Sequence, residues 1–190
     1  LNDGSVRTWG KYDGYGGNSS GVDFDGPNND LTVSQIFNTS ASFAAILSDG
    51  SVVSWGSVES GGDSTSVDFD GPNNDLFVTD ITGAVAHGIG AFAALRSDGS
   101  VVTWGNPDVG GDSSDVDFDG PNNDLLVSHI YTSNSAFAAL RSDGSVVTWG
   151  HYQAGGSSSN VDFDGPNDDL TVTQIFAGAL TGKGHFGAFA

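Results

Sequence analysis

The chain has 190 residues, of which 24 are acidic and 5 are basic, giving a formal net charge of −19. This charge excludes nucleic acid as a partner, because phosphate binding needs Lys and Arg to displace condensed counterions, and it disfavours an anionic membrane surface. The absence of Cys excludes disulfides, thiolate metal sites and Cys nucleophiles. The apolar runs are too short to cross a bilayer, so no membrane insertion is expected.

The composition favours an all-β protein that is rich in turns. The chain holds 29 Gly, and every acidic residue except Glu59 is Asp. Asp competes with the helical backbone for hydrogen bonds, and Asp with Gly is typical of tight turns. The sequence begins with Leu1 rather than Met. We therefore expect either a processed, secreted product or a segment of a longer protein, located outside the cell or on its surface.

Internal repeats fill the whole chain. The Trp-Gly pair occurs four times, at Trp9, Trp55, Trp104 and Trp149. The segment Val-Asp-Phe-Asp-Gly-Pro-Asn also occurs four times, beginning at Val22, Val67, Val116 and Val161. Self-similarity at a period of 20–50 residues is typical of repeat architectures. We therefore expect residues 1–190 to form a single repeat domain of four units, at about residues 1–45, 46–94, 95–139 and 140–190.

Each unit contains short segments with the composition of strands. In the first unit, Val22–Asp25 offers a short strand and Val33–Phe37 a longer one rich in β-branched residues. Further along, Phe92–Leu95 and Val101–Gly105 are apolar runs joined through Asp-Gly, and Phe137–Leu140 begins the same pattern again. Two such runs joined through Asp-Gly indicate a hairpin. About four short strands per unit match one blade of a β-propeller.

The two ends of the chain are halves of one internal pattern. If Leu1–Val6 is written after Gly187–Ala190, the result closely matches the internal segment Gly90–Val101, which spans a predicted hairpin. A split hairpin leaves strand edges that must be paired or covered. The four units could close on themselves by pairing of the two termini, or belong to an open or extended tandem array. In the second case the partner is another copy, through self-association at the complementary termini, or the continuation of a longer chain.

The segment Ile130–Gly150, with its Ala-Leu-Arg-Ser-Asp-Gly-Ser-Val-Val-Thr-Trp-Gly core, resembles repeats of the regulator of chromosome condensation family. The version found in large bacterial surface and secreted proteins is the most similar one, and the resemblance extends over all four units. It implies β-propeller blades, which the family usually arranges seven to a ring. The family's usual Gly-Gln-Leu-Gly stretch is replaced here, for example by Gly61–Ser64. Nothing in this sequence supports the nucleotide exchange activity of one branch of the family.

The repeated Asp-rich segment predicts a calcium-binding loop, here called the aspartate loop. Its template, Asp-x-Asp-x-Asp-Gly-x-x-(Asp/Asn), supplies the hard oxygen ligands that Ca²⁺ prefers, and its Gly allows a sharp turn. Because Asp alternates with Phe, the carboxylates lie on one side and the ring on the other, where Phe24, Phe69, Phe118 and Phe163 can anchor the loop in the core. Nearby carboxylates repel one another unless a cation or proton intervenes. A solvated Asx turn is the alternative interpretation.

The candidate calcium ligands lie in all four loops, and the third and fourth loops match the template best because only they have Asp or Asn at its first position. The candidates are Asp23, Asp25, Asn29 and Asp30; Ser66, Asp68, Asp70, Asn74 and Asp75; Asp115, Asp117, Asp119, Asn123 and Asp124; and Asn160, Asp162, Asp164, Asp168 and Asp169.

Two classes of function follow from these features. The first is a non-enzymatic, secreted or cell-surface, calcium-stabilised structural module, such as part of a surface array, an adhesin or a filament. The second is a propeller that binds protein or glycan through its loops. Binding propellers usually diversify their loops, whereas these loops mostly repeat. The Asp pairs that could suggest a glycosidase recur in every unit, whereas catalytic pairs are usually unique, so no enzyme is expected.

Overall fold

The computed structural model describes the chain except for residues 1–3, 11–13, 87, 166–169 and 179–187. The described residues form three three-stranded antiparallel sheets and one two-stranded sheet. The first sheet consists of β1 (Val33–Asn38), β2 (Ser42–Leu47) and β3 (Val52–Gly56), the second of β4 (Val78–Val85), β5 (Gly90–Arg96) and β6 (Val101–Gly105), the third of β7 (Val127–Thr132), β8 (Ala136–Arg141) and β9 (Val146–Gly150), and the fourth of β10 (Ala177–Gly178) and β11 (Ala188–Phe189).

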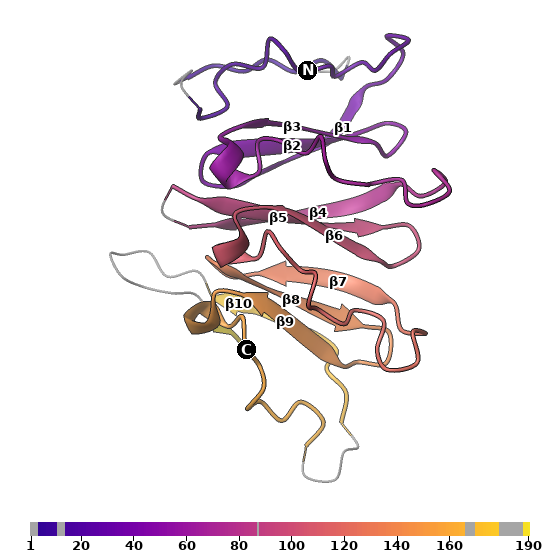
Figure 1. The fold of residues 1–190 in the computed structure, drawn as a ribbon, viewed down its shortest axis with the longest axis vertical. Helices are drawn as coiled ribbons and strands as arrows, with labels where there is room; N and C mark the ends of the chain where they lie inside the picture. The colour runs from indigo at the N-terminus through magenta and orange to yellow at the C-terminus, as the bar shows by residue number, and fades with distance from the viewer. Residues whose placement is uncertain (1–3, 11–13, 87, 166–169, 179–187) are drawn as a thin grey trace.

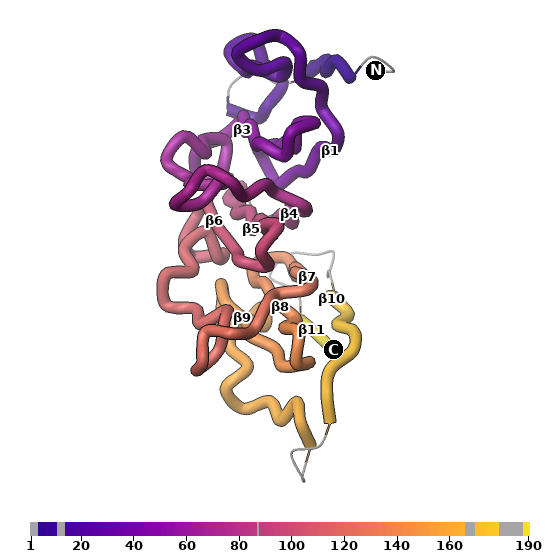
Figure 2. Tube along the Cα trace, turned by 90° about the vertical axis from the view of Figure 1, so that its right-hand side faces the viewer, coloured from indigo at the N-terminus to yellow at the C-terminus, as the bar shows by residue number. Residues whose placement is uncertain are grey.

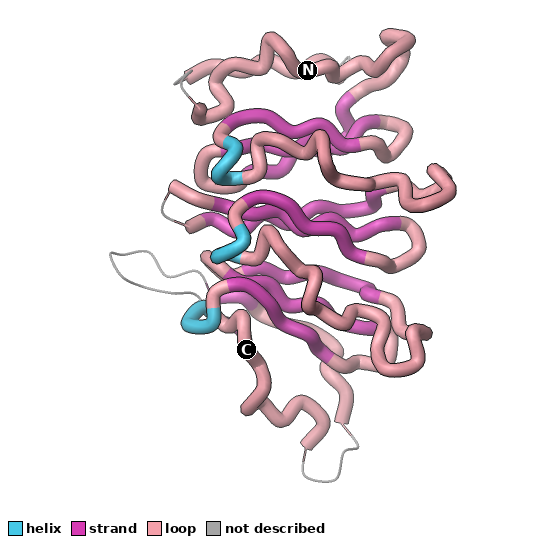
Figure 3. Tube along the Cα trace, in the orientation of Figure 1, coloured by secondary structure: helices cyan, strands magenta, loops and turns pink. Residues whose placement is uncertain are grey.

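The only helices among the described residues are single 3-10 turns that follow the third strand of each full sheet (Figure 3). These turns are η1 (Val58–Ser60), η2 (Pro107–Val109) and η3 (Tyr152–Ala154). The protein is therefore all-β, as its composition predicts. No helix in the described part of the chain is long and apolar enough to cross a membrane.

The predicted hairpins are confirmed. In the second sheet, β5 pairs with β6 so that Phe92 lies opposite Trp104, and the turn between them contains Gly99 at φ +80°. The third sheet repeats this register, with Phe137 opposite Trp149. The middle strands, β5 and β8, are nearly continuous apolar runs because other residues cover both of their faces. Phe92 and Phe137 on these strands are fully buried.

The predicted fourth strand is wrong. Residues 22–25 and the equivalent segments of the next two units are loops without ladder pairing. Their backbone groups bond locally instead, for example from the Val67 amide to the Ser64 carbonyl at 3.0 Å. The Asp side chains explain the difference, because Asp offers nearby amides a local acceptor that competes with strand pairing.

The sheets lie face to face in chain order and form an open row (Figures 1 and 2). The described N-terminal segment, Gly4–Gly10, lies at one end of the long axis, beyond the first sheet, whereas the fourth sheet lies near the other end against the third sheet. Leu1, which is expected to pair near Ala190, lies outside the described residues. The described segments that flank the two termini are therefore far apart within one chain.

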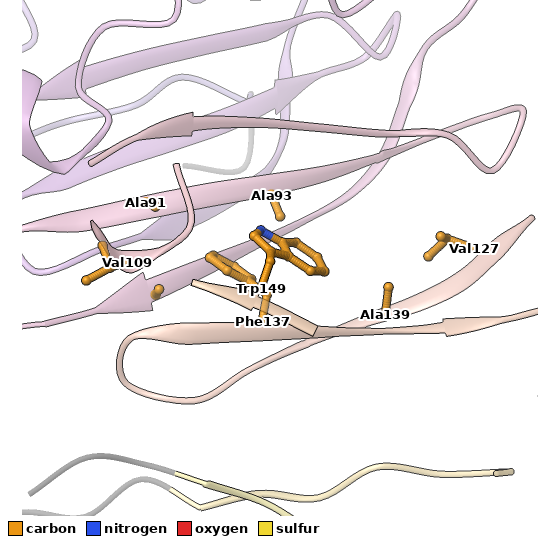
Figure 4. Packing of buried hydrophobic residues seen from close by; sticks show 8 residues of the cluster. Ala91, Ala93, Val109, Val127, Phe137, Ala139 and Trp149 are labelled. Carbon is orange, nitrogen blue, oxygen red and sulfur yellow. The ribbon is translucent and has the colours of Figure 1, made fainter. Parts of the chain in front are cut away.

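The core lies between neighbouring sheets rather than inside any one of them. Between the second and third sheets, Phe137 and Trp149 pack against Ala91 and Ala93 (Figure 4). The small Ala side chains of one middle strand make room for the large rings of the next sheet. Equivalent clusters form at the other two boundaries, so each sheet depends on a neighbour for its burial, as in solenoid proteins.

Candidate functional site

The same polar contact joins three successive units. The Trp104 indole Nε1–H donates to the Gly61 carbonyl at 3.0 Å. The equivalent bonds run from Trp55 to Gly16 and from Trp149 to Gly110, both at 3.1 Å. Each Gly belongs to the connection that precedes the sheet carrying the Trp, so the bond ties a connection to the following sheet.

The aspartate loops are anchored by aromatic packing on these Trp residues, as the alternating sequence predicts. Phe69 meets Trp104 edge-on with ring centroids 5.2 Å apart, while Phe92 stacks on the same indole at 5.0 Å. The first and third loops repeat this arrangement, with Phe24 on Trp55 and Phe118 on Trp149 at 5.1 Å. The indoles of Trp55, Trp104 and Trp149 therefore each contact one stacked ring and one edge-on ring, and each donates to a backbone carbonyl.

In the second, third and fourth loops, an Asp side chain closes a turn around a Gly. The amide of Gly71 donates to the Asp68 carboxylate at 2.7 Å, and the pairs Gly120–Asp117 and Gly165–Asp162 match that distance. These Gly residues have φ between +73° and +76°, a conformation that costs Gly little. The sharp turn that the calcium template requires is therefore present, although an Asx turn has the same geometry.

Two Arg residues supply positive charge beside the loops, which the sequence analysis missed. The Arg96 guanidinium donates to the Asp68 carbonyl at 3.3 Å, and Arg141 donates to the Asp117 carbonyl at 3.5 Å. Both are held in place by a bond from Nε to a Ser of the following turn, at 2.7 Å. The second and third loops thus have a counter-charge from the chain itself. In the first sheet Leu47 takes the equivalent position.

The candidate calcium ligands do not converge in the described structure. Among the residues it describes, no three acidic or His side chains are grouped as a metal site would require. In the third loop, Asn123 instead donates to the Asp119 carboxylate at 2.9 Å. Asp168 and Asp169 lie outside the described residues. The loops carry oxygen donors of the type that Ca²⁺ prefers, and the ligand assignment remains a prediction.

The Asp-Gly-Ser turns between the second and third strands carry further carboxylates. In the last of them, hydrogen bonds from the Ser145 hydroxyl and amide lower the pKa of the Asp143 carboxyl below its ordinary value. The Asp98 carboxyl behaves alike: burial acts to raise its pKa, but the bonds from Ser100 and the charge of Arg96 leave it lowered. These bonds favour the charged form, so we assign the turn carboxylates a structural role.

An open depression of about 740 Å³ lies beside β6. Its lining combines the carboxylates of Asp63, Asp68 and Asp112 with small polar groups and the side of Arg96. A similar depression of about 380 Å³ lies beside β9. Both follow from the repeat, and neither lining includes a His that could serve as a catalytic base.

Comparisons with known proteins add little. No family model matches the chain, and no curated protein matches it. Among solved structures, the chain is similar to human WBSCR16 at 22% sequence identity and a TM-score of 0.38, over 66% of this chain and 36% of that one. The chain thus spans about a third of the length of that protein. We draw nothing about function from so distant a likeness.

Proposed function

We propose that the chain is a non-enzymatic structural module built from propeller-type repeats, which extends a surface array, an adhesin or a filament outside the cell. The observation that carries this proposal is the repeated joint, in which the indole of Trp55, Trp104 or Trp149 is buried against the connection before its own sheet. A contact that recurs unchanged along one axis suits extension rather than selective recognition. A binding module would gain more from joints and loops that differ.

The sheet arrangement supports the same proposal. The sheets lie in an open row (Figure 1), so further units can be added at an end without disturbing those already present. Solenoid-like rows gain stability from each added neighbour. A net charge of −19 would keep such rows apart from one another.

We further propose that Ca²⁺ stabilises the aspartate loops. The support is the oxygen-only donor set, the Gly turn and the number of carboxylates on each loop. A bound Ca²⁺ would supply positive charge that neutralises these carboxylates. In the fourth loop, Asn160, Asp162 and Asp164 would contribute ligands, and Asp117 and Asp119 would do so in the third.

The calcium proposal predicts a thermal shift. At a calcium concentration about 100 times the dissociation constant, each occupied loop should add about 2.7 kcal/mol to the free energy of unfolding. Melting curves recorded with chelator and with millimolar-range calcium should differ by several degrees. Asp119→Asn should remove part of this difference, whereas Asp108→Asn, the same charge change on η2 outside the loops, should leave it intact. Coincident curves with chelator and with calcium would contradict the proposal.

Immunogold labelling of intact source cells tests the structural role itself. Antibodies against the purified chain should decorate extracellular fibres or a surface layer without permeabilisation. Labelling that appears only after permeabilisation would overturn the proposed role.

A further inference from the structure

Asp-Gly pairs, which recur throughout the chain, are sites of a slow rearrangement of the backbone. The glycine nitrogen attacks the Cγ of the preceding Asp side chain and closes a five-membered succinimide, while the carboxyl hydroxyl and the amide proton leave as water. Water then opens the ring at either carbonyl and gives Asp again or isoaspartate, whose main chain runs through the side-chain carbon. Gly favours the attack because it has no side chain in the way and its backbone turns freely.

The described residues contain seven complete Asp-Gly pairs, which serve as controls for one another. They begin at Asp25, Asp49, Asp70, Asp98, Asp119, Asp143 and Asp164. An amide that donates a hydrogen bond must give up that bond before its nitrogen can attack. A carboxylate that accepts hydrogen bonds is likewise held away from the amide. The hydrogen bonds around each pair therefore predict the order in which the pairs react.

The three pairs in the Asp-Gly-Ser turns are held at both reacting groups. The amides of Gly50, Gly99 and Gly144 donate to backbone carbonyls at 2.9–3.0 Å, and the Asp carboxylates accept from the Ser that follows each Gly. In the last turn, the bonds from Ser145 lower the pKa of the Asp143 carboxyl, which leaves less of the neutral acid from which water departs. These three pairs should react slowly.

Three of the aspartate loops also hold the glycine amide. In the second, third and fourth loops this amide donates, at 2.7 Å, to the Asp carboxylate two residues before the reacting Asp. The third loop adds a bond from the Asn123 side chain to the Asp119 carboxylate at 2.9 Å. The third loop is therefore held at both reacting groups and the second and fourth loops at the amide.

The first aspartate loop lacks this protection. Its Asp23 carboxylate accepts from the Asp25 amide at 3.2 Å, and no described residue accepts a hydrogen bond from the Gly26 amide or donates one to the Asp25 carboxylate. The Asp25 side chain is exposed. The sequence Val-Asp-Phe-Asp-Gly-Pro-Asn is the same in all four loops, so the difference arises from the fold.

We propose that Asp25 is the first of these seven sites to form isoaspartate. The rearrangement adds one carbon to the main chain between Asp25 and Gly26, one residue after Phe24, whose ring meets Trp55 edge-on at 5.1 Å. The lengthened loop changes the path that places this ring, so the anchor of the first loop loosens as the protein ages. This inference goes beyond the proposed structural role and depends on neither that role nor calcium.

Peptide mapping of the aged protein tests the site. The purified 190-residue protein is incubated at neutral pH and physiological temperature, with chelator so that no cation shields Asp25. After digestion, an isoaspartyl methyltransferase labels the modified peptides. Label should accumulate first in the peptide with Asp25 and much later in that with Asp119, whereas in urea the two should react alike. Asp25→Glu, which cannot close the five-membered ring, should lose the early label. Equal rates at Asp25 and Asp119 in the folded protein would overturn the proposal.

Removing one acceptor should create a second fast site. Asp68→Ala leaves the Gly71 amide without its acceptor, so isoaspartate formation at Asp70 should rise by about tenfold. Asp68→Asn keeps a side-chain oxygen that accepts the bond, and Asp70 should then react as slowly as in the wild type. An unchanged rate at Asp119 in the same samples shows that the fold is intact. If Asp68→Ala left the rate at Asp70 unchanged, the hydrogen bond would not be what protects the pair, and the proposal would be wrong.

Discussion

Replacing Trp104 by Ala should lower the free energy of unfolding by about 3–5 kcal/mol, the usual cost of truncating a large buried ring. The indole is 4% exposed, stacks on Phe92, meets Phe69 edge-on, and donates to the Gly61 carbonyl. Its removal opens a cavity, leaves that carbonyl without its donor and frees the aspartate loop from its anchor. Urea unfolding followed by circular dichroism measures the change.

Trp9→Ala is the matched control, because it makes the same chemical change at the same repeat position. Trp9 is 84% exposed, so in dilute solution the free energy of unfolding should change by no more than about 0.5 kcal/mol. Equal losses at both positions would mean that the inter-sheet joint does not depend on burial of the indole.

Gly105→Ala should destabilise the protein by about 2–6 kcal/mol through two effects that add. Gly105 has φ +105°, a conformation that costs a residue with a side chain about 1–3 kcal/mol. A Cβ at this position would also lie 2.7 Å from the Gly90 carbonyl oxygen and 2.9 Å from the Ala91 Cα. Such overpacking against backbone costs about 1–3 kcal/mol more.

Gly10→Ala separates these two effects. Gly10 has φ +123° but nothing within 4 Å of a Cβ, so in dilute solution only the conformational cost should appear. If the unfolding free energy of the two variants depends equally on denaturant concentration, the difference between their denaturation midpoints measures the energetic cost of the close approach between neighbouring strands. If both variants lost the same stability, the close approach would contribute nothing.

The hairpins could be predicted from the sequence because their signals are local. The Asp-Gly turn and the apolar runs on either side lie within about a dozen residues, and β5 and β6 form as predicted. The prediction of a strand at Val22–Asp25 failed for a reason that is also local. The alternation of apolar residues with Asp is that of a strand, but in this loop the Asp23 carboxylate instead accepts from the Asp25 amide at 3.2 Å.

Contacts between units could not be read from the sequence, because spacing within a unit does not say which surfaces meet. The bond from Trp104 to Gly61 spans 43 residues, and that from Arg96 to the Asp68 carbonyl spans 28. The sequence argument about repelling carboxylates therefore omitted Arg96 and Arg141, which stand beside two of the four loops.

Small-angle X-ray scattering of the monomeric protein is the most direct test of the open row. The sheets lie face to face in chain order, and the described N-terminal segment lies at the opposite end of the long axis from the fourth sheet. The account predicts the scattering of an elongated particle, whose distribution of interatomic distances has a long tail. A compact, symmetric distribution of distances would indicate a closed ring and would contradict the row.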